Sequence, residues 1–249
     1  MRREFIYFLV AVQVLTRLPV PRLHGFAEKW IERGVKYFPL TGAIVGTVCA
    51  ATLLAASHVW QGVLPALLTV AVGIAITGGL HEDGFADFFD SMGGATREAR
   101  LSIMKDSRIG TYGALALGAG LAIKVFALAG LPLWVAAAAM VPAHAGGRLA
   151  AVGVISLLPY AGGISAAKIK PLGRGVTGTE LAIAAAFGML PLLLLPRHFG
   201  LPALAAGAAA AVFAAIAARR MLGGYTGDVL GAVEQTFEIA FLLTAAACV

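Results

Sequence analysis

Charge-free apolar runs divide much of the chain into segments long enough to cross a membrane. Residues 37–80 contain no Asp, Glu, Lys or Arg, and this length allows two helices joined by a turn near residues 57–62. Residues 109–147 contain one charged residue, Lys124, and are interrupted by Gly, Leu and Pro at 130–132. The second run therefore predicts another helix pair, whose return helix ends near residue 158.

The rest of the chain contains a third apolar pair and two shorter runs. The pair is expected over residues 181–196 and 200–218, with a turn between them. Residues 237–249 are short for a full span, and residues 4–16 are short enough to form an interfacial or re-entrant helix instead. The pattern predicts an all-α fold: a polytopic integral membrane helical bundle of about six or seven transmembrane helices, in a single membrane-embedded domain over residues 1–249.

Composition agrees with the bilayer as the solvent. Hydrophobic residues make up 59% of the chain and charged residues 13%, against roughly 25% charged in soluble domains. The 31 Gly and 11 Pro form neither a collagen-like period nor a polar low-complexity tract, which excludes disorder. The two cysteines, Cys49 and Cys248, have no metal-ligand spacing and are interpreted as packed or lipid-facing thiols.

The basic residues indicate an orientation. Three hairpins with tight apolar turns return the chain to one side, and most of the 19 Lys and Arg fall in the segments that would share that side. The bias of basic residues toward the cytoplasm then predicts a multi-pass protein of the bacterial cytoplasmic (inner) membrane whose chemistry faces the cytoplasm. The net charge of +6 is therefore not taken as a sign of nucleic-acid binding.

The densest acidic stretch holds Asp83, Asp87 and Asp90. On a helix these positions (i, i+4, i+7) fall within about 60° of one another. Three oxygen ligands on one face suit a hard ion such as Mg²⁺. On the same helical wheel His81 lies roughly opposite and Glu82 lies well off this face.

A plain acidic helix start is the alternative for this stretch. The helix dipole would favour acidic residues in the first turn. That alternative does not explain Asp87 and Asp90, which stand among phenylalanines at the edge of an apolar span, where ionisable groups are costly and usually functional.

A second cluster precedes the run that begins at residue 109. Lys105, Asp106, Ser107 and Arg108 combine cations, a carboxylate and a hydroxyl with nearby glycines. An Arg fork and backbone N–H groups at a helix start can hold phosphate. A positive anchor at a span boundary is the simpler alternative, but it would need only the cations.

A third cluster places Thr226, Gly227 and Asp228 in a glycine-rich stretch, followed by Glu234 and Glu238. Glycines allow a ligand or metal to approach the backbone closely. A tight interhelical turn explains the same stretch equally well.

Two isolated cations lie near or within spans. Arg148 follows two glycines near the middle of its segment and is a functional candidate, whereas Lys124 could extend to the membrane surface. Together, the carboxylates, cations and glycines fit metal-assisted phosphoryl transfer best. No Ser-His-Asp set, Cys-x-x-Cys pair or Walker loop competes with this interpretation.

Several of these strings, in this order and spacing, resemble the cobalamin synthase family of adenosylcobinamide-GDP ribazoletransferases. The similar segments cover most of the chain: residues 15–21 (LTRLPVP), 38–42 (FPLTG), 78–90 (GGLHEDGFADFFD), 103–113 (IMKDSRIGTYG) and 223–232 (GGYTGDVLGA). Residues 160–177 match no recognised pattern, although Lys168, Lys170 and Arg174 could meet phosphate or anionic lipid.

The resemblance implies a membrane-embedded catalytic domain that requires Mg²⁺. It would join α-ribazole or its 5'-phosphate to adenosylcobinamide-GDP and release GMP. Beyond these substrates and membrane lipids, other cobamide-assembly enzymes are conceivable partners, and no nucleic acid is expected. The implied roles are metal binding by Asp83, Asp87, Asp90 and Asp228; catalysis by Asp83, Asp87, Asp106 and Arg108; and substrate binding by Lys105, Ser107, Arg148, Thr226 and Gly227.

Two other classes compete. A CDP-alcohol phosphotransferase that makes lipid headgroups also places aspartates on membrane helices, but its pattern DGxxAR has Arg where this chain has Asp87. A cation transporter would use Asp83, Asp87 and Asp90 near the middle of the membrane, whereas here they lie at a span end beside a basic cluster.

Overall fold

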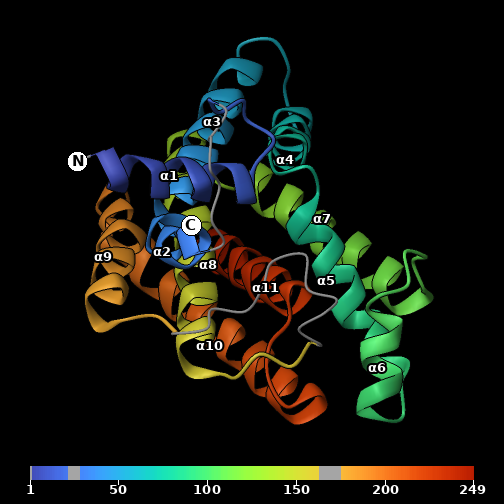
Figure 1. The fold of residues 1–249 in the computed structure, drawn as a ribbon. Helices are drawn as coiled ribbons and strands as arrows, with labels where there is room; N and C mark the ends of the chain where they lie inside the picture. The colour runs from blue at the N-terminus through green and yellow to red at the C-terminus, as the bar shows by residue number, and fades with distance from the viewer. Residues whose placement is uncertain (1, 22–28, 163–174) are drawn as a thin grey trace.

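The computed structural model describes residues 2–21, 29–162 and 175–249, and this part of the chain is helical, with one isolated bridge between Tyr160 and Tyr225. Figure 1 shows the helices gathered around α11. The elements are α1 (Arg2–Leu15), α2 (Lys29–Gly34), η1 (Val35–Tyr37), α3 (Phe38–Ser57), α4 (Leu64–Thr77), α5 (Leu80–Asp90), η2 (Ser91–Gly93), α6 (Arg97–Ile103), α7 (Thr111–Gly130), α8 (Leu133–Leu157), α9 (Gly178–Met189), η4 (Leu190–Leu194), α10 (Arg197–Leu222) and α11 (Gly227–Ala247).

The predicted helical membrane bundle is confirmed. Five helices in the described residues are long and apolar enough to span a membrane, and a sixth span results if α4 and the segment after it are counted as one bent pair. The first two predicted hairpins appear as α3 with α4 and as α7 with α8, and each turn lies where the apolar run was interrupted.

The third predicted pair differs in its first member. The apolar segment Gly178–Leu194 is too short to count among the candidate spans. Its α-helix ends at Met189 and continues as a 3₁₀ turn that contains Pro191 near its start. Proline cannot donate the backbone hydrogen bond that would continue an α-helix.

The C-terminal helix corrects the expectation of a short final run. Helix α11 begins at Gly227, has 21 residues and counts as a candidate span. It therefore includes Glu234, which lies before the predicted apolar run, as well as Glu238, the second residue of that run. Both carboxylates are buried and contact cations or histidines on other helices, so they do not interrupt the helix.

Helices α4 and α5 meet at a bend of 91°. Gly78 and Gly79 form this bend, with φ of +69° and +70°. Both angles lie in the left-handed region, which residues with a Cβ adopt at an energetic cost. The double glycine thus ends α4 and lets α5, which we call the aspartate helix, run nearly perpendicular to it.

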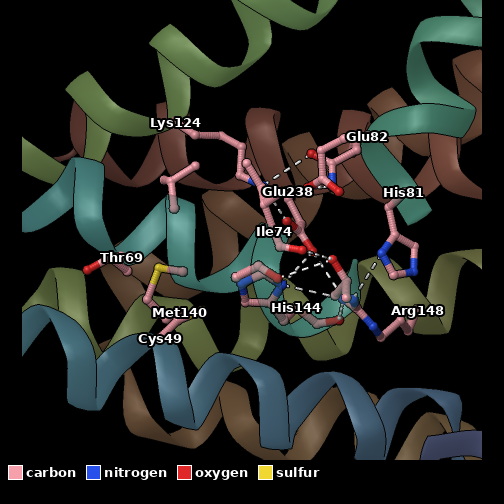
Figure 2. Close-up of a pocket in the computed structure, with 14 residues that line it drawn as sticks. Cys49, Thr69, Ile74, His81, Glu82, Lys124, Met140, His144, Arg148 and Glu238 are labelled. Atoms are coloured by element: carbon pink, nitrogen blue, oxygen red, sulfur yellow. Dashed lines mark hydrogen bonds and ion pairs between the residues drawn. The ribbon is translucent and has the colours of Figure 1, made fainter. Parts of the chain in front are cut away.

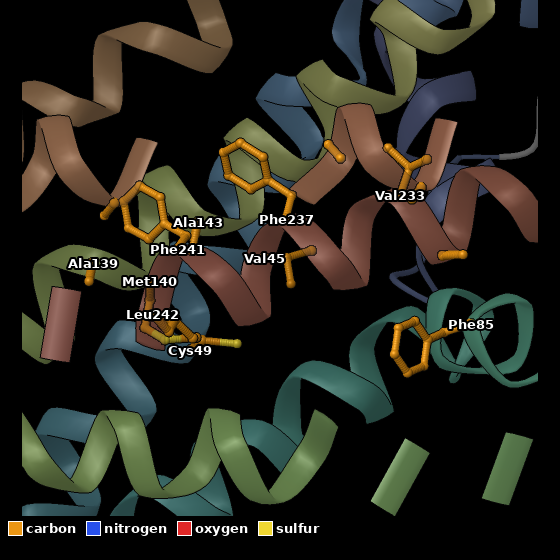
Figure 3. Packing of buried hydrophobic residues seen from close by; sticks show 14 of the residues in the cluster. Val45, Cys49, Phe85, Ala139, Met140, Ala143, Val233, Phe237, Phe241 and Leu242 are labelled. Carbon is orange, nitrogen blue, oxygen red and sulfur yellow. The ribbon is translucent and has the colours of Figure 1, made fainter. Parts of the chain in front are cut away.

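Small residues let the spans pack closely around α11. A Cβ on Gly46 of α3 would stand 2.5 Å from the Met140 oxygen of α8, which agrees with the close packing expected of small residues in membrane helices. Figure 3 shows the apolar core beside this contact, with Phe237 and Phe241 of α11 and the buried thiol of Cys49. Helix α11 packs against α5, α7, α8 and α10, and so connects the core to the aspartate helix.

Candidate active site

The predicted aspartate helix exists, and its aspartates become more buried toward its C-terminal end. Asp83 is exposed, Asp87 is half-buried and Asp90 is buried, all on α5. His81 and Glu82 are buried on another side of the same helix. The helical spacing therefore correctly separated the aspartates from these two residues, and Asp83 and Asp87 form an edge of α5 that substrate can reach.

Close backbone contact joins this edge to the third motif. A Cβ on Gly84 would lie 2.8 Å from both the Cα and the carbonyl oxygen of Asp228, the second residue of α11. From the other side, a Cβ on Gly231 would lie 2.9 Å from the carbonyl oxygen of His81. Two facing glycines thus let α5 and α11 cross closely, and they place the backbone of Asp228 against Gly84, the residue after Asp83.

The glycine-rich stretch before Asp228 is both a turn and a helix start. Gly223 ends α10 in the left-handed conformation, with φ of +80°. The hydroxyl of Thr226 accepts a hydrogen bond from the Val229 N–H at 3.2 Å and caps α11. Gly227 follows with open space where a Cβ would be. The substrate-binding roles expected of Thr226 and Gly227 stay predictions.

We expect Gly84→Ala to destabilise the protein. The added methyl would meet backbone atoms of Asp228 that cannot rotate away, and such overpacking costs about 1–3 kcal/mol. Thermal unfolding in detergent measures the effect. Gly118→Ala on α7 is the matched control, because its Cβ meets nothing within 4 Å and Ala favours the helix. Equal melting temperatures for the two variants would contradict the close crossing.

Asp90 connects the aspartate helix to the second motif. Its carboxylate oxygens accept hydrogen bonds from the N–H groups of Gly110 at 2.7 Å and Gly113 at 2.8 Å. These donors lie at the start of α7, where backbone N–H groups lack helical partners. Asp90 thus holds the N-terminus of α7 against α5, and the metal-binding role expected of it stays a prediction.

The loop before α7 presents the predicted phosphate-binding groups to solvent. Lys105, Ser107 and Arg108 are exposed. The Arg108 guanidinium donates two hydrogen bonds from Nε and one from Nη2 to the Asp106 carboxylate, which also accepts the Arg108 N–H at 3.1 Å. These bonds lower the pKa of Asp106 to about 2. Asp106 is therefore ionised near neutral pH and orients Arg108.

The carboxylates fit Mg²⁺ only in an open form of site. Within the described ranges, no group of three or more His, Cys, Asp or Glu side chains is arranged to hold a metal ion. Mg²⁺ commonly takes one or two protein carboxylates and completes its octahedron with waters and substrate phosphates. The edge formed by exposed Asp83 and half-buried Asp87 offers donors of this kind.

Sequence reasoning missed a cluster of buried polar side chains beside the core. Figure 2 shows these side chains converging between α5, α7, α8 and α11. Lys124 contacts Glu238 at 2.7 Å, Arg148 contacts the same carboxylate at 3.1 Å, and His144 does so at 2.7 Å. His81 lies 2.9 Å from a carboxylate oxygen of Glu234.

The same cluster reaches the aspartate helix through a glutamine. Gln235 donates a hydrogen bond to Glu82 at 3.1 Å and accepts one from Lys124 at 3.1 Å. The buried cluster thus consists of three carboxylates, two cations, two histidines and one amide: Glu82, Glu234, Glu238, Lys124, Arg148, His81, His144 and Gln235. All of these residues except Glu234 help to line a cavity of about 10 Å³, room for roughly one water molecule. A nucleotide or corrinoid cannot enter this space.

Two sequence-based expectations change here. Lys124 does not extend to the membrane surface, because its side chain is 4% exposed and its amine is held inside the bundle. Arg148 is not isolated, since it contacts Glu238 and lies 3.6 Å from Glu234. Its side chain is 1% exposed, away from the aspartate edge, and its substrate-binding role stays a prediction. Lys168, Lys170 and Arg174 lie outside the described residues.

Comparison with known proteins extends over nearly the whole chain. The profile of the cobalamin-5-phosphate synthase family matches residues 7–246. A Leptothrix cholodnii protein named adenosylcobinamide-GDP ribazoletransferase is 42% identical over 248 residues, which cover 95% of this chain and 93% of the relative. A protein of the same name from Shewanella sp. strain W3-18-1 is 39% identical over 251 residues, covering 97% and 94%. No solved structure matches the chain. The chain therefore belongs to the cobalamin-5-phosphate synthase family.

Proposed function

We propose that this protein joins α-ribazole, or its 5'-phosphate, to adenosylcobinamide-GDP and releases GMP. The two relatives described above are named for this reaction, and they align with this chain over almost their full length. The observation that carries the proposal is one connected arrangement, in which α5 contacts Asp228 of α11 through Gly84 and, through Asp90, the loop before α7. This arrangement supports a site in which carboxylates for a metal and cations for a diphosphate would lie near one another.

Mg²⁺ is proposed as the cofactor, held by Asp83 and Asp87 with Asp228 beside them. When bound, it would neutralise diphosphate charge and stabilise the leaving phosphate. Lys105 and Arg108 would bind diphosphate oxygens from the neighbouring loop, and Asp106 keeps the planar fork of Arg108 oriented. A free ribose hydroxyl of the ribazole substrate would then attack the phosphate attached to cobinamide, forming a phosphodiester as the diphosphate bond to the departing GMP breaks.

The proposed site lies on the cytoplasmic side of the bacterial inner membrane. The support is the charge pattern: most basic residues fall in the segments that connect the hairpins on the side of the aspartate helix, as expected for cytoplasmic loops. Both substrates would then be bound from the cytoplasm, while lipids surround the spans.

Turnover by purified protein tests this proposal. GMP release would be measured in detergent from adenosylcobinamide-GDP with α-ribazole and, separately, with its 5'-phosphate, first with Mg²⁺ and then with EDTA. We expect GMP and a cobalamin product with Mg²⁺ and neither with EDTA. A folded sample that releases no GMP with Mg²⁺ would refute the proposal, and a CDP-alcohol donor and then ion flux in liposomes would be tested next.

A variant of Asp90 distinguishes a structural role of this residue from a metal-binding role. We expect Asp90→Asn to lower the thermal stability by about 1–3 kcal/mol, because the amide offers one acceptor oxygen to two backbone N–H groups. The Mg²⁺ concentration for half-maximal GMP release should not change. A raised Mg²⁺ requirement at wild-type stability would instead support the metal-binding role that the family resemblance implied.

A further inference from the structure

Arg17 is fixed at the bend that begins the aspartate helix. It follows α1 in the string LTRLPVP, to which the proposed reaction gives no role. Its N–H donates to the carbonyl of Ile76 at 2.6 Å, in the last turn of α4. The hydroxyl of the preceding residue, buried Thr16, donates to Val12 at 2.7 Å and accepts the Leu18 N–H at 3.2 Å. The backbone around Arg17 is thus held by α1 and α4.

The side chain of Arg17 lies directly against Gly78. A Cβ on Gly78 would overlap the Arg17 Nε and would lie 2.9 Å from its Cγ and 3.2 Å from its Cδ. The absence of a side chain at Gly78 is therefore what lets the arginine lie across the bend. At Gly79, with nearly the same φ, a Cβ would meet only Ile74, at 4.0 Å.

The Arg17 guanidinium has no carboxylate partner among the described residues. The residue is exposed, and no Asp or Glu of residues 2–21, 29–162 and 175–249 lies within ion-pair distance of it. In contrast, Arg108 is paired with Asp106, and Arg97 donates to the carbonyls of Leu222 and Ala161. Arg17 therefore presents hydrogen-bond donors to the surface that are not used within this part of the chain.

The position of Arg17 relative to the aspartates suits an elongated anion. From Leu80, the first residue of α5, the helix rises about 4.5 Å to Asp83 and about 10.5 Å to Asp87. Arg17 lies at the N-terminal end of this edge, and the loop that carries Lys105 and Arg108 adjoins its C-terminal end through Asp90. Cations thus stand at both ends of the carboxylates, about 15 Å apart along α5, so Arg17 and this loop would meet different parts of an elongated, nucleotide-linked anion.

We infer that Arg17 is a substrate-binding residue whose guanidinium contacts a phosphate group of the nucleotide-linked substrate. The inference rests on the proposed function for the identity of that substrate. An arginine fork binds phosphate through two parallel hydrogen bonds, which a fixed backbone and a flat glycine support would orient. A phosphate of a membrane lipid has the same chemistry, so the test must separate the two sources.

Equilibrium dialysis of adenosylcobinamide-GDP, followed by the corrinoid absorbance, measures binding without turnover. In lipid-free detergent with Mg²⁺, we expect Arg17→Gln to raise the dissociation constant about tenfold or more, the usual effect of losing a charge-assisted hydrogen bond, and Arg17→Lys to recover part of the affinity. Unchanged affinity in Arg17→Gln would overturn the inference. So would a loss that appears only in nanodiscs with anionic lipid, because it would assign Arg17 to a headgroup.

The double glycine provides a matched control. Gly78→Ala and Gly79→Ala impose the same left-handed strain, but only the alanine at 78 displaces Arg17. We expect Gly78→Ala to weaken substrate binding as much as Arg17→Gln does. The double variant Arg17→Gln with Gly78→Ala should lose no more affinity than either single variant. Gly79→Ala should bind substrate nearly as tightly as wild type. Equal losses in the two alanine variants would overturn the inference. Wild-type protein that binds substrate without releasing GMP would refute the proposed reaction and leave the Arg17 contact standing.

Discussion

Asp87→Asn should reduce GMP release by at least about a hundredfold, because a carboxylate that holds Mg²⁺ contributes several kcal/mol to charge stabilisation in the transition state. Asp83→Asn should have a similar effect, since the two side chains form the same exposed edge of α5. Asn keeps the size of the side chain and the helix, but it removes the negative charge. The initial rate of GMP release at saturating substrate, with Mg²⁺ varied, measures the loss.

The control must remove an acidic charge from the same part of the molecule. Glu98 is exposed in the first turn of α6, between the aspartate helix and the phosphate-binding loop. Glu98→Gln should therefore keep nearly wild-type activity. Thermal unfolding in detergent checks that all three variants are folded. If Asp87→Asn released GMP at the wild-type rate, the metal site proposed on α5 would be wrong.

The membrane fold was predictable where the local sequence marks the ends of the spans. A charge-free run interrupted by glycine or proline has the length of two spans and the turn between them, and α3, α4, α7 and α8 agree with that pattern. Helical periodicity also separated Asp83 and Asp87 from His81 on opposite sides of α5. In both cases, the deciding interactions are between residues close in sequence.

What the sequence did not reveal depends on contacts between distant residues. Hydropathy began the last apolar run at residue 237, between Glu234 and Glu238, yet the partners of these carboxylates on α5, α7 and α8 allow α11 to start at Gly227. Lys124 alone resembled a cation that extends to the surface. Ionisable residues inside apolar segments, such as Lys124, were an available signal of buried polar contacts. However, no spacing rule connects Lys124 with a carboxylate more than a hundred residues later.

The burial of Asp90 has the same origin. Its helical position placed it on the face of Asp83 and Asp87, which is correct for an isolated helix. The N-terminus of α7 covers that end of the face, and the two glycines that donate to Asp90 leave no room for side chains: a Cβ on Gly113 would overlap the carboxylate. The aspartate motif, predicted to bind a metal, thus also holds the N-terminus of α7 against α5.

Glu238→Gln should lower the free energy of unfolding by about 3–5 kcal/mol, the usual cost of removing one partner from a buried ion pair. Glu238 is 1% exposed and contacts both Lys124 and Arg148. Its loss leaves Lys124 without a carboxylate in ion-pair contact among the described residues, whereas Arg148 keeps Glu234 at 3.6 Å. Thermal and denaturant-induced unfolding in detergent measures the change, and Arg108→Gln, which breaks an exposed pair outside the bundle, should melt close to wild type.

A double variant decides whether the effect comes from charge. Lys124→Met removes the cation nearest to Glu238, at 2.7 Å, and fills similar space with an apolar side chain. If the buried charges are coupled, Lys124→Met combined with Glu238→Gln should be more stable than the sum of the two single losses predicts, because neither partner is then left unpaired. Additive losses would mean that Glu238 stabilises the bundle by packing alone. The coupling would show why a helix with two buried glutamates remains a membrane span: the cations on α7 and α8 that pair with them are part of the same core.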